Sequence, residues 1–336
     1  MAAVAAKGNA SPEVLLAPDG LDASMLHRFA DGIASGHAAA PAGTGAAFLA
    51  RIEQLAAVEA QRREWSRQLP HLDRRSRAQR VRQLPGGAHE DTLFDLAAHL
   101  TGFLQRRLPV EANIVANRYV DIAPQGPSGW ATLPLFLSLH AAEAGDIALA
   151  EAMLAPSPPR LIVIGGLSGT GKSTLARLLG ARLGRGPGAR VLRSDIFRKR
   201  LAGIAPETRL PPAHYTRHND EETYEAVFES AYDHLACGSS VILDAVFLSR
   251  SERDVAEALA FRIDVPFTGI WLEAPERDRI ARVAARSGDA SDATPEVVRE
   301  QSRLSIGELS GWHRMRVNRP LEVIVAAARA VLERRR

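Results

Sequence analysis

Residues 166–173 read Gly-Leu-Ser-Gly-Thr-Gly-Lys-Ser, which matches the phosphate-binding pattern Gly-x-x-x-x-Gly-Lys-Ser/Thr at every constrained position. The apolar run 161–164 before it is rich in β-branched residues, as a buried strand is. The Ala, Leu and Arg stretch 173–183 after it is typical of a helix. Strand, glycine loop and helix thus come in the required order. The alternative, a glycine-rich turn without a ligand, is disfavoured by the complete pattern.

The residue types of this loop predict what it binds. Its glycines let the backbone turn N–H groups inward around phosphate, and the start of the next helix adds a positive dipole end. Lys172 can reach the β- and γ-phosphates, and the Ser173 hydroxyl can bind Mg²⁺. Only three lysines accompany 39 arginines, so a lysine at position 172 fits a chemical requirement. We expect ATP and Mg²⁺ as ligands, with contacts from Gly166, Leu167, Ser168, Gly169, Thr170, Gly171, Lys172, Ser173 and Thr174.

Composition bounds the class of protein. The chain has 336 residues, 46% of them hydrophobic, so we expect two domains with packed cores. No apolar run approaches the ~18 residues of a membrane span, and the first residues do not resemble a secretory signal. The single cysteine, Cys237, excludes an internal disulfide framework and is expected to be an inert, partly buried thiol. These features favour the cytoplasm and no membrane partner. The formal charge of +3 does not by itself indicate nucleic acid.

A proline-rich stretch, 155–159, is interpreted as a linker between residues 1–155 and 156–336. After it, strand and helix signals alternate. This alternation predicts an α/β fold of the P-loop NTPase type, with a parallel sheet flanked by helices. The expected strands are 161–164, 190–193, 240–243, 267–272 and 312–317. The expected helices are 173–183, 221–236, 251–261, 275–286, 295–307 and 320–334.

The first part of the chain is expected to be mainly helical. Residues 1–50 are rich in Ala, Gly and Ser, with weak helical periodicity at 22–34. Segment 62–82 carries eight arginines, which could form a nucleic-acid or phosphate-binding patch. Regular aromatic interleaving is lacking, so a solvated arginine-rich helix and loop is the favoured interpretation. Helices are expected at 51–68, 91–107, 110–121 and 130–150.

The second expected strand leads into a candidate catalytic carboxylate, Asp195. Strand ends in such sheets face the ligand crevice, and a carboxylate there can orient an attacking hydroxyl and accept its proton. Arg198, one helical turn later, is expected to pair with Asp195 or with a group of the acceptor. The alternative role for Asp195 is to N-cap a helix that starts at Ile196, and the two roles are compatible.

Residues 241–244 form an apolar strand that ends in Asp244, which is the form of a Walker B motif. Asp244 is expected to hold Mg²⁺ through water or to position the acceptor. Ala245 follows where many motor-type ATPases place a glutamate that activates water, so transfer to another acceptor is favoured over hydrolysis. The chain contains no Asn-Lys-x-Asp motif, which disfavours a GTPase switch.

A third feature is an arginine-rich helix near residue 280. Arg282 and Arg286 are spaced i, i+4 and therefore share a helix face, and Arg277 and Arg279 lie on the same helix. Arginines that close over a triphosphate neutralise the charge that develops during transfer. The following stretch, 287–292, suits a lid that opens and closes. The alternative is an ordinary charged helix face.

From about residue 160 to 330 the chain resembles the small P-loop kinases of the zeta-toxin and polynucleotide-kinase type, through GLSGTGKS, RSDIFRKR, VILDAVF and RVAARSGDASDA. It more closely resembles the ATP-binding half of bacterial bifunctional aminoglycoside phosphotransferase/ATP-binding proteins, in the AAA-type P-loop family. The stretches RSDIFRKRLAGIAPETRLPP and DASDA are the most specific. The resemblance implies that Asp195 is the base and that Arg198 holds a charged group of the acceptor. It also implies that Arg282 and Arg286 clamp the phosphates.

Residues 1–155 resemble a remnant of the phosphotransferase half of those proteins, through segments 95–97, 117–119 and 133–137. That half needs a His-Gly-Asp-x-x-x-x-Asn catalytic loop. The nearest stretch here is 89–91, which reads His-Glu-Asp, and Leu96 stands where asparagine is required. We therefore expect this region to be non-catalytic, as a helical scaffold or an acceptor-binding cap.

Three functions follow from these features. The leading one is a kinase that transfers the γ-phosphoryl group of Mg-ATP to a small-molecule hydroxyl acceptor. The second is an ATP-binding regulatory module with slow hydrolysis, and the third is a polynucleotide 5′-end kinase, with nucleic acid as the less favoured partner. The acceptor site is expected in segments 198–224 and 246–253, where His214, Tyr215, His218 and Tyr224 lie.

Overall fold

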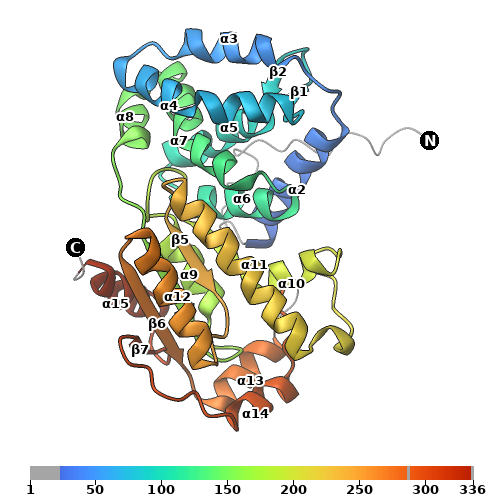
Figure 1. Cartoon of the computed structure of the whole chain (residues 1–336), viewed down its shortest axis with the longest axis vertical. Coiled ribbons are helices and arrows are strands. Elements are labelled where there is room, and N and C mark those ends of the chain that lie inside the picture. The colour runs from blue at the N-terminus through green and yellow to red at the C-terminus, as the bar shows by residue number, and fades with distance from the viewer. Residues whose placement is uncertain (1–22, 286–287, 334–336) are drawn as a thin grey trace. The chain divides into compact units, whose positions relative to one another are not determined.

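The computed structural model describes residues 23–285 and 288–333 of the chain, and contacts between Cα atoms divide them into two units (Figure 1). Unit 1 comprises the residues up to 157 together with 184–189, and unit 2 comprises 158–183 and the residues from 190 onward. Arg286, one of the two expected lid arginines, lies outside the described residues.

Unit 2 is built on a five-stranded sheet whose neighbouring strands all pair in parallel, in the order β4-β5-β3-β6-β7. The predicted α/β fold with a parallel sheet is therefore confirmed. In register, Val163 of the central strand lies opposite Leu243 on one side and Gly269 on the other. The strands are β3 (Leu161–Gly165), β4 (Arg190–Arg193), β5 (Val241–Asp244), β6 (Phe267–Glu273) and β7 (His313–Arg316).

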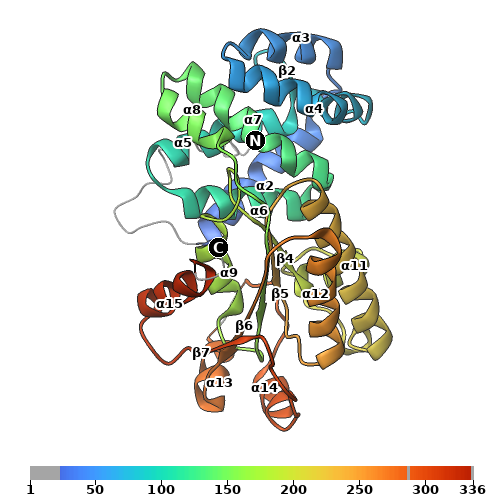
Figure 2. The same cartoon turned by 60° about the vertical axis from the view of Figure 1, so that its left-hand side comes forward.

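Helices cover both faces of this sheet, with α9 and α15 on one face and α11 and α12 on the other (Figure 2). This arrangement buries the sheet on both sides, which explains why β3 and β5 are apolar runs without alternation. The helices of unit 2 are α9 (Lys172–Gly180), α10 (Ser194–Leu201), α11 (Arg217–Ala236), α12 (Arg250–Ile263), α13 (Glu276–Ala284), α14 (Pro295–Ser302) and α15 (Leu321–Glu333), with a short 3₁₀ helix, η1 (Pro212–His214).

Local capping sets where several of these helices begin. The Ser249 side chain and Glu252 form a capping box at the start of α12. Thr294 accepts from the N–H of Val297 at the start of α14, where Pro295 occupies the first turn. At the C-terminal end of α11, Cys237 is the C-cap residue and is partly buried, as expected.

The strand order places the loop after β3 at a special point of the sheet. From β3 the chain crosses first to β4 and β5 on one side, and later to β6 and β7 on the other. In open parallel sheets, ligands bind beyond the carboxyl ends of the strands where the strand order reverses in this way. The loop 166–173 follows β3 and therefore lies at that switch point.

Unit 1 is mainly helical and buries its own apolar core, which includes Phe48, Phe94 and Phe136 in edge-to-face contact. The prediction of a single helix at 51–68 is wrong, because residues 56–58 are not helical and separate α3 from α4. The expectations also missed a two-stranded hairpin. The elements are α2 (Ala23–Ala39), α3 (Gly45–Leu55), α4 (Glu59–Arg77), β1 (Val81–Gln83), β2 (His89–Asp91), α5 (Thr92–Gln105), α6 (Pro109–Ile122), α7 (Gly126–Glu143) and α8 (Ile147–Leu154).

Segment 184–189 lies between α9 and β4 in sequence but belongs to unit 1. Asn113 donates from Nδ2 to the carbonyl oxygens of Pro187 and Ala189, at 3.2 and 3.0 Å. Arg185 forms an ion pair with Glu64 at 3.0 Å. The polypeptide therefore returns to unit 1 after the first strand and helix of unit 2.

The arginine-rich segment 62–82 is largely paired within unit 1. Arg75 is buried and forms two hydrogen bonds to the carboxylate of Asp91. Asp91 also accepts from the N–H of Leu93 and so caps α5. Arg67 pairs with Glu64 on the same helix. These contacts favour the structural interpretation of the segment.

Within the described residues, no helix has both the length and the apolar character that crossing a membrane requires.

Candidate functional site

Two glycines of the phosphate loop, residues 166–173, are required by its backbone. Gly169 has a φ of +83°, and a Cβ atom there would lie 2.6 Å from the backbone oxygen of Arg279. Gly171 has a φ of +91° and is the N-cap residue of α9. Because side chains rarely adopt such φ values, the turn into α9 depends on glycine at these positions.

The other predicted phosphate-binding residues lie in the same loop and the first turn of α9. Lys172 donates from Nζ to the carbonyl oxygen of Leu167 at 3.3 Å, so its side chain lies back over the loop. Thr170 is buried and donates from Oγ1 to the same carbonyl at 2.8 Å. Ser173 and Thr174 follow at the start of the helix. An ammonium group beside a helix N-terminus is a favourable environment for phosphate.

A buried arginine that the sequence analysis overlooked joins two strand ends. Arg193 ends β4 directly opposite Asp244 of β5, and its Nε lies 3.3 Å from Oδ2 of that aspartate. Its Nη2 also donates to Oδ1 of Asp289 at 2.7 Å. Burial alone would lower the pKa of Arg193, but the carboxylates of Asp289, Asp244 and Asp195 raise it above its usual value. Arg193 therefore remains a fixed cation among carboxylates.

Asp195 lies in the first turn of α10, which begins at Ser194. The expectation that it N-caps a helix starting at Ile196 is therefore wrong, because Arg193 occupies the N-cap position. Burial raises the pKa of Asp195, Arg193 opposes this, and Asp244 reinforces it. A carboxylate with a raised proton affinity is a better proton acceptor near neutral pH than an ordinary aspartate.

Asp244, the predicted metal ligand, is almost fully buried at the end of β5. Among the residues that the structure describes, its Oδ2 has no hydrogen-bond partner, although it lies 3.3 Å from Nε of Arg193. A buried carboxylate oxygen without such a partner fits a role in holding a metal directly or through water. Mg²⁺ is usually held by one or two protein oxygens together with phosphates and waters. Asp244 and the hydroxyl of Ser173 are oxygen ligands of the kind that Mg²⁺ prefers, and a magnesium site formed by the two stays a prediction.

A cavity of about 840 Å³, here called the central pocket, opens beside the phosphate loop. Ser168 of the phosphate loop lines it together with Asp195. Both expected acceptor segments also contribute to its wall, including Tyr215 and Tyr224. His214 and His218, the other two candidates, are not part of the lining. The pocket therefore places the predicted base and a phosphate-loop residue around one space.

Arg198 enters the central pocket from α10 and pairs with Asp220 at 2.6 Å, so the expected pairing with Asp195 is not observed. Its guanidinium also lies over the ring of Tyr215, 5.2 Å from the centroid. Its Nη1 is buried without a hydrogen-bond partner in the described residues. A buried guanidinium nitrogen without a partner can donate a hydrogen bond to an oxygen atom of a bound ligand.

One carboxylate in segment 288–294 fixes the far side of the pocket. Asp292 accepts from the Tyr215 hydroxyl at 2.6 Å and from the N–H of Leu210 at 3.0 Å. It also forms an ion pair with the buried Lys199 at 3.0 Å. The stretch DASDA was noted for its resemblance and as part of an expected lid, but no local pattern indicated these contacts with residues more than 75 positions earlier.

The arginine helix, α13, lies against the phosphate loop. Arg282 donates from Nη1 to the carbonyl oxygen of Gly169 at 3.4 Å and from Nη2 to that of Val317 at 3.1 Å. Arg279 is buried and donates to the hydroxyl of Ser302 on α14. Arg277 is exposed and pairs with its neighbour Asp278, so it belongs to an ordinary charged surface. Of the predicted pair, Arg282 reaches the loop and Arg286 is not described.

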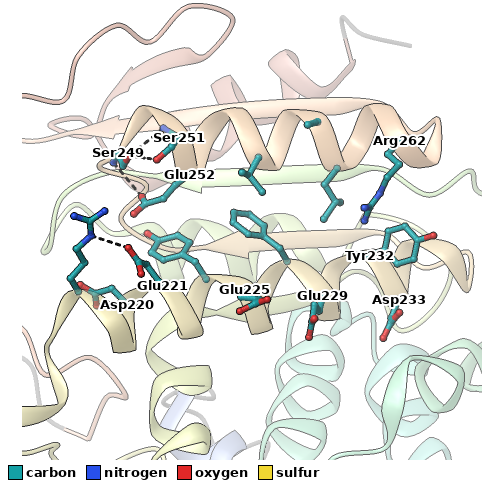
Figure 3. Close-up of a pocket in the computed structure, with 16 residues that line it drawn as sticks. Asp220, Glu221, Glu225, Glu229, Tyr232, Asp233, Ser249, Ser251, Glu252 and Arg262 are labelled. Carbon is teal, nitrogen blue, oxygen red and sulfur yellow. Dashed lines mark hydrogen bonds and ion pairs between the residues drawn. The ribbon is translucent and has the colours of Figure 1, made fainter.

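A larger hollow, the α11–α12 groove, lies on the α11 and α12 face of the sheet and has a volume of about 1120 Å³ (Figure 3). Apolar side chains such as Phe228 line it, and so do acidic side chains of α11 such as Glu225 and Glu229, which Figure 3 labels. It shares Tyr224 and Glu252 with the central pocket but contains no residue of the phosphate loop. The α11–α12 groove is therefore not the candidate active site, although it is larger than the central pocket.

Residues 161–305 match the family model described as an AAA domain. The match begins at β3 and includes the phosphate loop, Asp195, Asp244 and α14, and it covers less than half of the chain. This segment of unit 2 is therefore similar to that family, and it carries the phosphate-loop pattern at residues 166–173.

Among curated proteins, the chain is 34% identical over 142 residues to the uncharacterized protein Rv2004c of Mycobacterium tuberculosis strain ATCC 25618 / H37Rv. It has the same identity over the same length to the uncharacterized protein Mb2027c of Mycobacterium bovis. The alignments cover 41% of this chain and 28% of each relative, so the chain spans little more than a quarter of the length of these proteins.

Three solved structures resemble part of the chain. A gluconokinase from Sinorhizobium meliloti 1021 has 22% identity and a TM-score of 0.39, with 53% of this chain and 94% of that chain covered. The APS kinase CysC of Mycobacterium tuberculosis in complex with AMPPNP and APS has 17% identity and a TM-score of 0.37, with 53% and 99% covered. A putative kinase from Chloroflexus aurantiacus j-10-fl has 20% identity and a TM-score of 0.42, with 54% and 100% covered. Likeness at this level does not determine a substrate.

Proposed function

We propose that unit 2 transfers the γ-phosphoryl group of Mg-ATP to a hydroxyl group of a small molecule bound in the central pocket. The observation that carries this proposal is that Ser168 of the phosphate loop and Asp195 line the same pocket. A phosphoryl group held by the loop and a hydroxyl oriented by the carboxylate would therefore meet in one space. Such positioning, with electrostatic stabilisation, is the main contribution of proteins to phosphoryl transfer.

In the proposed step, the acceptor oxygen forms a bond to the γ-phosphorus while the bond to the β–γ bridging oxygen breaks. Asp195 takes the proton of the attacking hydroxyl, and the products are ADP and a phosphate ester. Lys172 and Arg282, which both donate to carbonyl oxygens of the phosphate loop, would neutralise the oxygens of the transferred group. Mg²⁺, held by Ser173 and Asp244, would shield the negative charge of the phosphates. Arg286 stays a predicted phosphate contact.

Arg198 suggests what the acceptor carries besides a hydroxyl. Arg198 and Tyr215 both line the central pocket, and Nη1 of Arg198 is buried without a hydrogen-bond partner among the described residues. An anionic group such as a carboxylate or phosphate would accept a hydrogen bond from this nitrogen. The acceptor class proposed here is therefore a hydroxylated small molecule with one anionic group. Residues 1–155 are proposed to be non-catalytic, because Asp91 is held by Arg75 and caps α5.

A regulatory ATP-binding module is the second candidate, since the buried Ala245 directly follows Asp244 and supplies no group to activate water. The polynucleotide alternative loses one of its two supports, because arginines of segment 62–82 pair within unit 1, and it keeps only the resemblance to polynucleotide kinases. The test is ADP production from Mg-ATP by parent and Asp195→Asn with sugars, sugar acids, nucleosides and aminoglycosides. Equal rates for the two proteins with the preferred acceptor would remove Asp195 from the mechanism.

A further inference from the structure

The phosphate loop makes one hydrogen bond that a nucleotide would have to replace. The backbone N–H of Ser168 donates to Oε1 of Gln301 across 2.8 Å. Gln301 belongs to α14 and lies 133 residues later in the sequence. Backbone N–H groups of a phosphate loop are the donors that hold phosphate oxygens. A glutamine carbonyl therefore occupies a donor that is suited to an anion.

The position of Ser168 indicates which phosphate this donor serves. Ser168 lines the central pocket together with Asp195, and Gln301 is part of the same wall. The phosphoryl group that is transferred must lie between the loop and the attacking hydroxyl. The N–H of Ser168 therefore faces the γ-phosphate end of the nucleotide, which ATP has and ADP lacks.

The helix that carries Gln301 is fixed by contacts that do not involve the glutamine. Val298 is fully buried, Thr294 caps the first turn of α14, and Ser302 accepts from the buried Arg279 of α13. The amide of Gln301 is thus brought to the loop by a seated helix. Release of Ser168 requires rotation of one side chain rather than movement of the helix.

We propose that Gln301 is a γ-phosphate surrogate, which holds the N–H of Ser168 until the terminal phosphate of ATP displaces it. The inference rests on the proposed function of unit 2 and adds a regulatory element to its site. Gln301 lowers the affinity for nucleoside triphosphates and leaves that for diphosphates unchanged. Because Gln301 also lines the central pocket, its displacement changes the acceptor site, so that the triphosphate binds before the acceptor.

The test measures binding rather than turnover. Dissociation constants for the non-hydrolysable analogue AMPPNP and for ADP, both with Mg²⁺, are determined by titration calorimetry for the full chain. For Gln301→Ala, AMPPNP is expected to bind about two- to tenfold more tightly, which corresponds to the net worth of one hydrogen bond. ADP is expected to bind as it does to the parent. Gln301→Glu is expected to weaken AMPPNP binding, because its carboxylate holds the N–H more firmly and repels the phosphate. The matched control is Glu300→Gln, an exposed position on the same helix.

Unchanged or weaker AMPPNP binding to Gln301→Ala, or equal changes for both nucleotides, would overturn the surrogate role and leave the proposed kinase intact. A parent protein that binds neither nucleotide would overturn both proposals. The two failures are therefore distinguishable in one set of titrations.

Discussion

The hydroxyl group of Tyr215 donates to Asp292 across 2.6 Å and thereby joins two segments that lie 77 residues apart. The same carboxylate neutralises Lys199, whose side chain is 1% exposed. Asp292→Ala is expected to destabilise the protein by about 3 kcal/mol, because it leaves this ammonium group buried without a counter-charge. Tyr215→Phe keeps the ion pair and should cost about 1 kcal/mol. Urea unfolding of both variants measures the difference. The control is Asp254→Ala, whose ion pair with Arg250 is exposed. Equal losses for all three would contradict this role of Asp292.

Asp195→Asn tests the base. It is expected to lower kcat by about 10²- to 10⁴-fold while the Kd for AMPPNP changes little, because in the proposed mechanism the carboxylate acts on the acceptor rather than on the nucleotide. A proportional loss of nucleotide affinity in calorimetry would instead place Asp195 in the ATP site.

The same carboxylate predicts a pH dependence. The base must be deprotonated to act, and burial raises the pKa of Asp195 above that of an ordinary aspartate. The kcat–pH profile is therefore expected to have its acid limb above pH 3.9, which is about the pKa of an ordinary aspartate. Activity is lost as the pH falls through the raised pKa of Asp195. A flat profile from pH 4 to pH 8 would contradict the assignment.

Arg198→Ala is expected to raise the KM for an anionic acceptor about tenfold or more, with little change in the Kd for AMPPNP, because a charge-assisted hydrogen bond is lost. Arg198→Lys should recover part of the affinity. The comparison uses sugar acids against the corresponding neutral sugars. Arg217→Ala is the control, since Arg217 is almost fully exposed and lies outside the central pocket. An equal KM increase for neutral and anionic acceptors would argue against anion recognition.

Unit 1 contains a buried histidine that couples stability to pH. Burial lowers the pKa of His140 to about 4, against the opposing effect of its hydrogen bond to the carbonyl oxygen of Phe94. The unfolded chain binds this proton below about 6.5, so the stability from neutral His140 is present above that pH. It is lost as the pH falls from about 6.5 towards 4.

His140→Gln should therefore reduce the loss of unfolding free energy between pH 7 and pH 5 by about 2 kcal/mol. His218→Gln, an exposed position, is the control and should leave the pH dependence of the parent unchanged. Superimposable pH profiles for His140→Gln and the parent would contradict the explanation.

Much of unit 2 could be predicted from the sequence because its signals are local. The strand at 161–165 is a continuous apolar run, and the phosphate loop follows it with a pattern whose glycines are required by the backbone. Asp195 and Asp244 could be found because Asp195 comes two residues after β4 and Asp244 ends β5, and these paired parallel strands end at the same edge of the sheet. The helix expected at 295–307 begins at Pro295, because proline suits the first helical turn.

The features that could not be predicted from the sequence depend on contacts between residues that are distant along the chain. Arg193 was overlooked because its two carboxylate partners come from β5 and from a segment 96 positions later. Gln301 has no distinguishing neighbour on α14, and only the folded chain brings it to Ser168. The return of 184–189 to unit 1 likewise depends on Asn113, which no linear boundary could indicate.

The most direct test of the central claim is ADP production from Mg-ATP by the parent chain and by Lys172→Ala. Both are assayed alone and with aminoglycosides, sugars, sugar acids, nucleosides and 5′-hydroxyl oligonucleotides. We expect the rate of ADP production to rise with one class of hydroxylated acceptor that carries an anionic group, and this rise to depend on Lys172. Slow turnover that no acceptor changes, with AMPPNP still bound by the parent, would contradict phosphoryl transfer and favour the regulatory module.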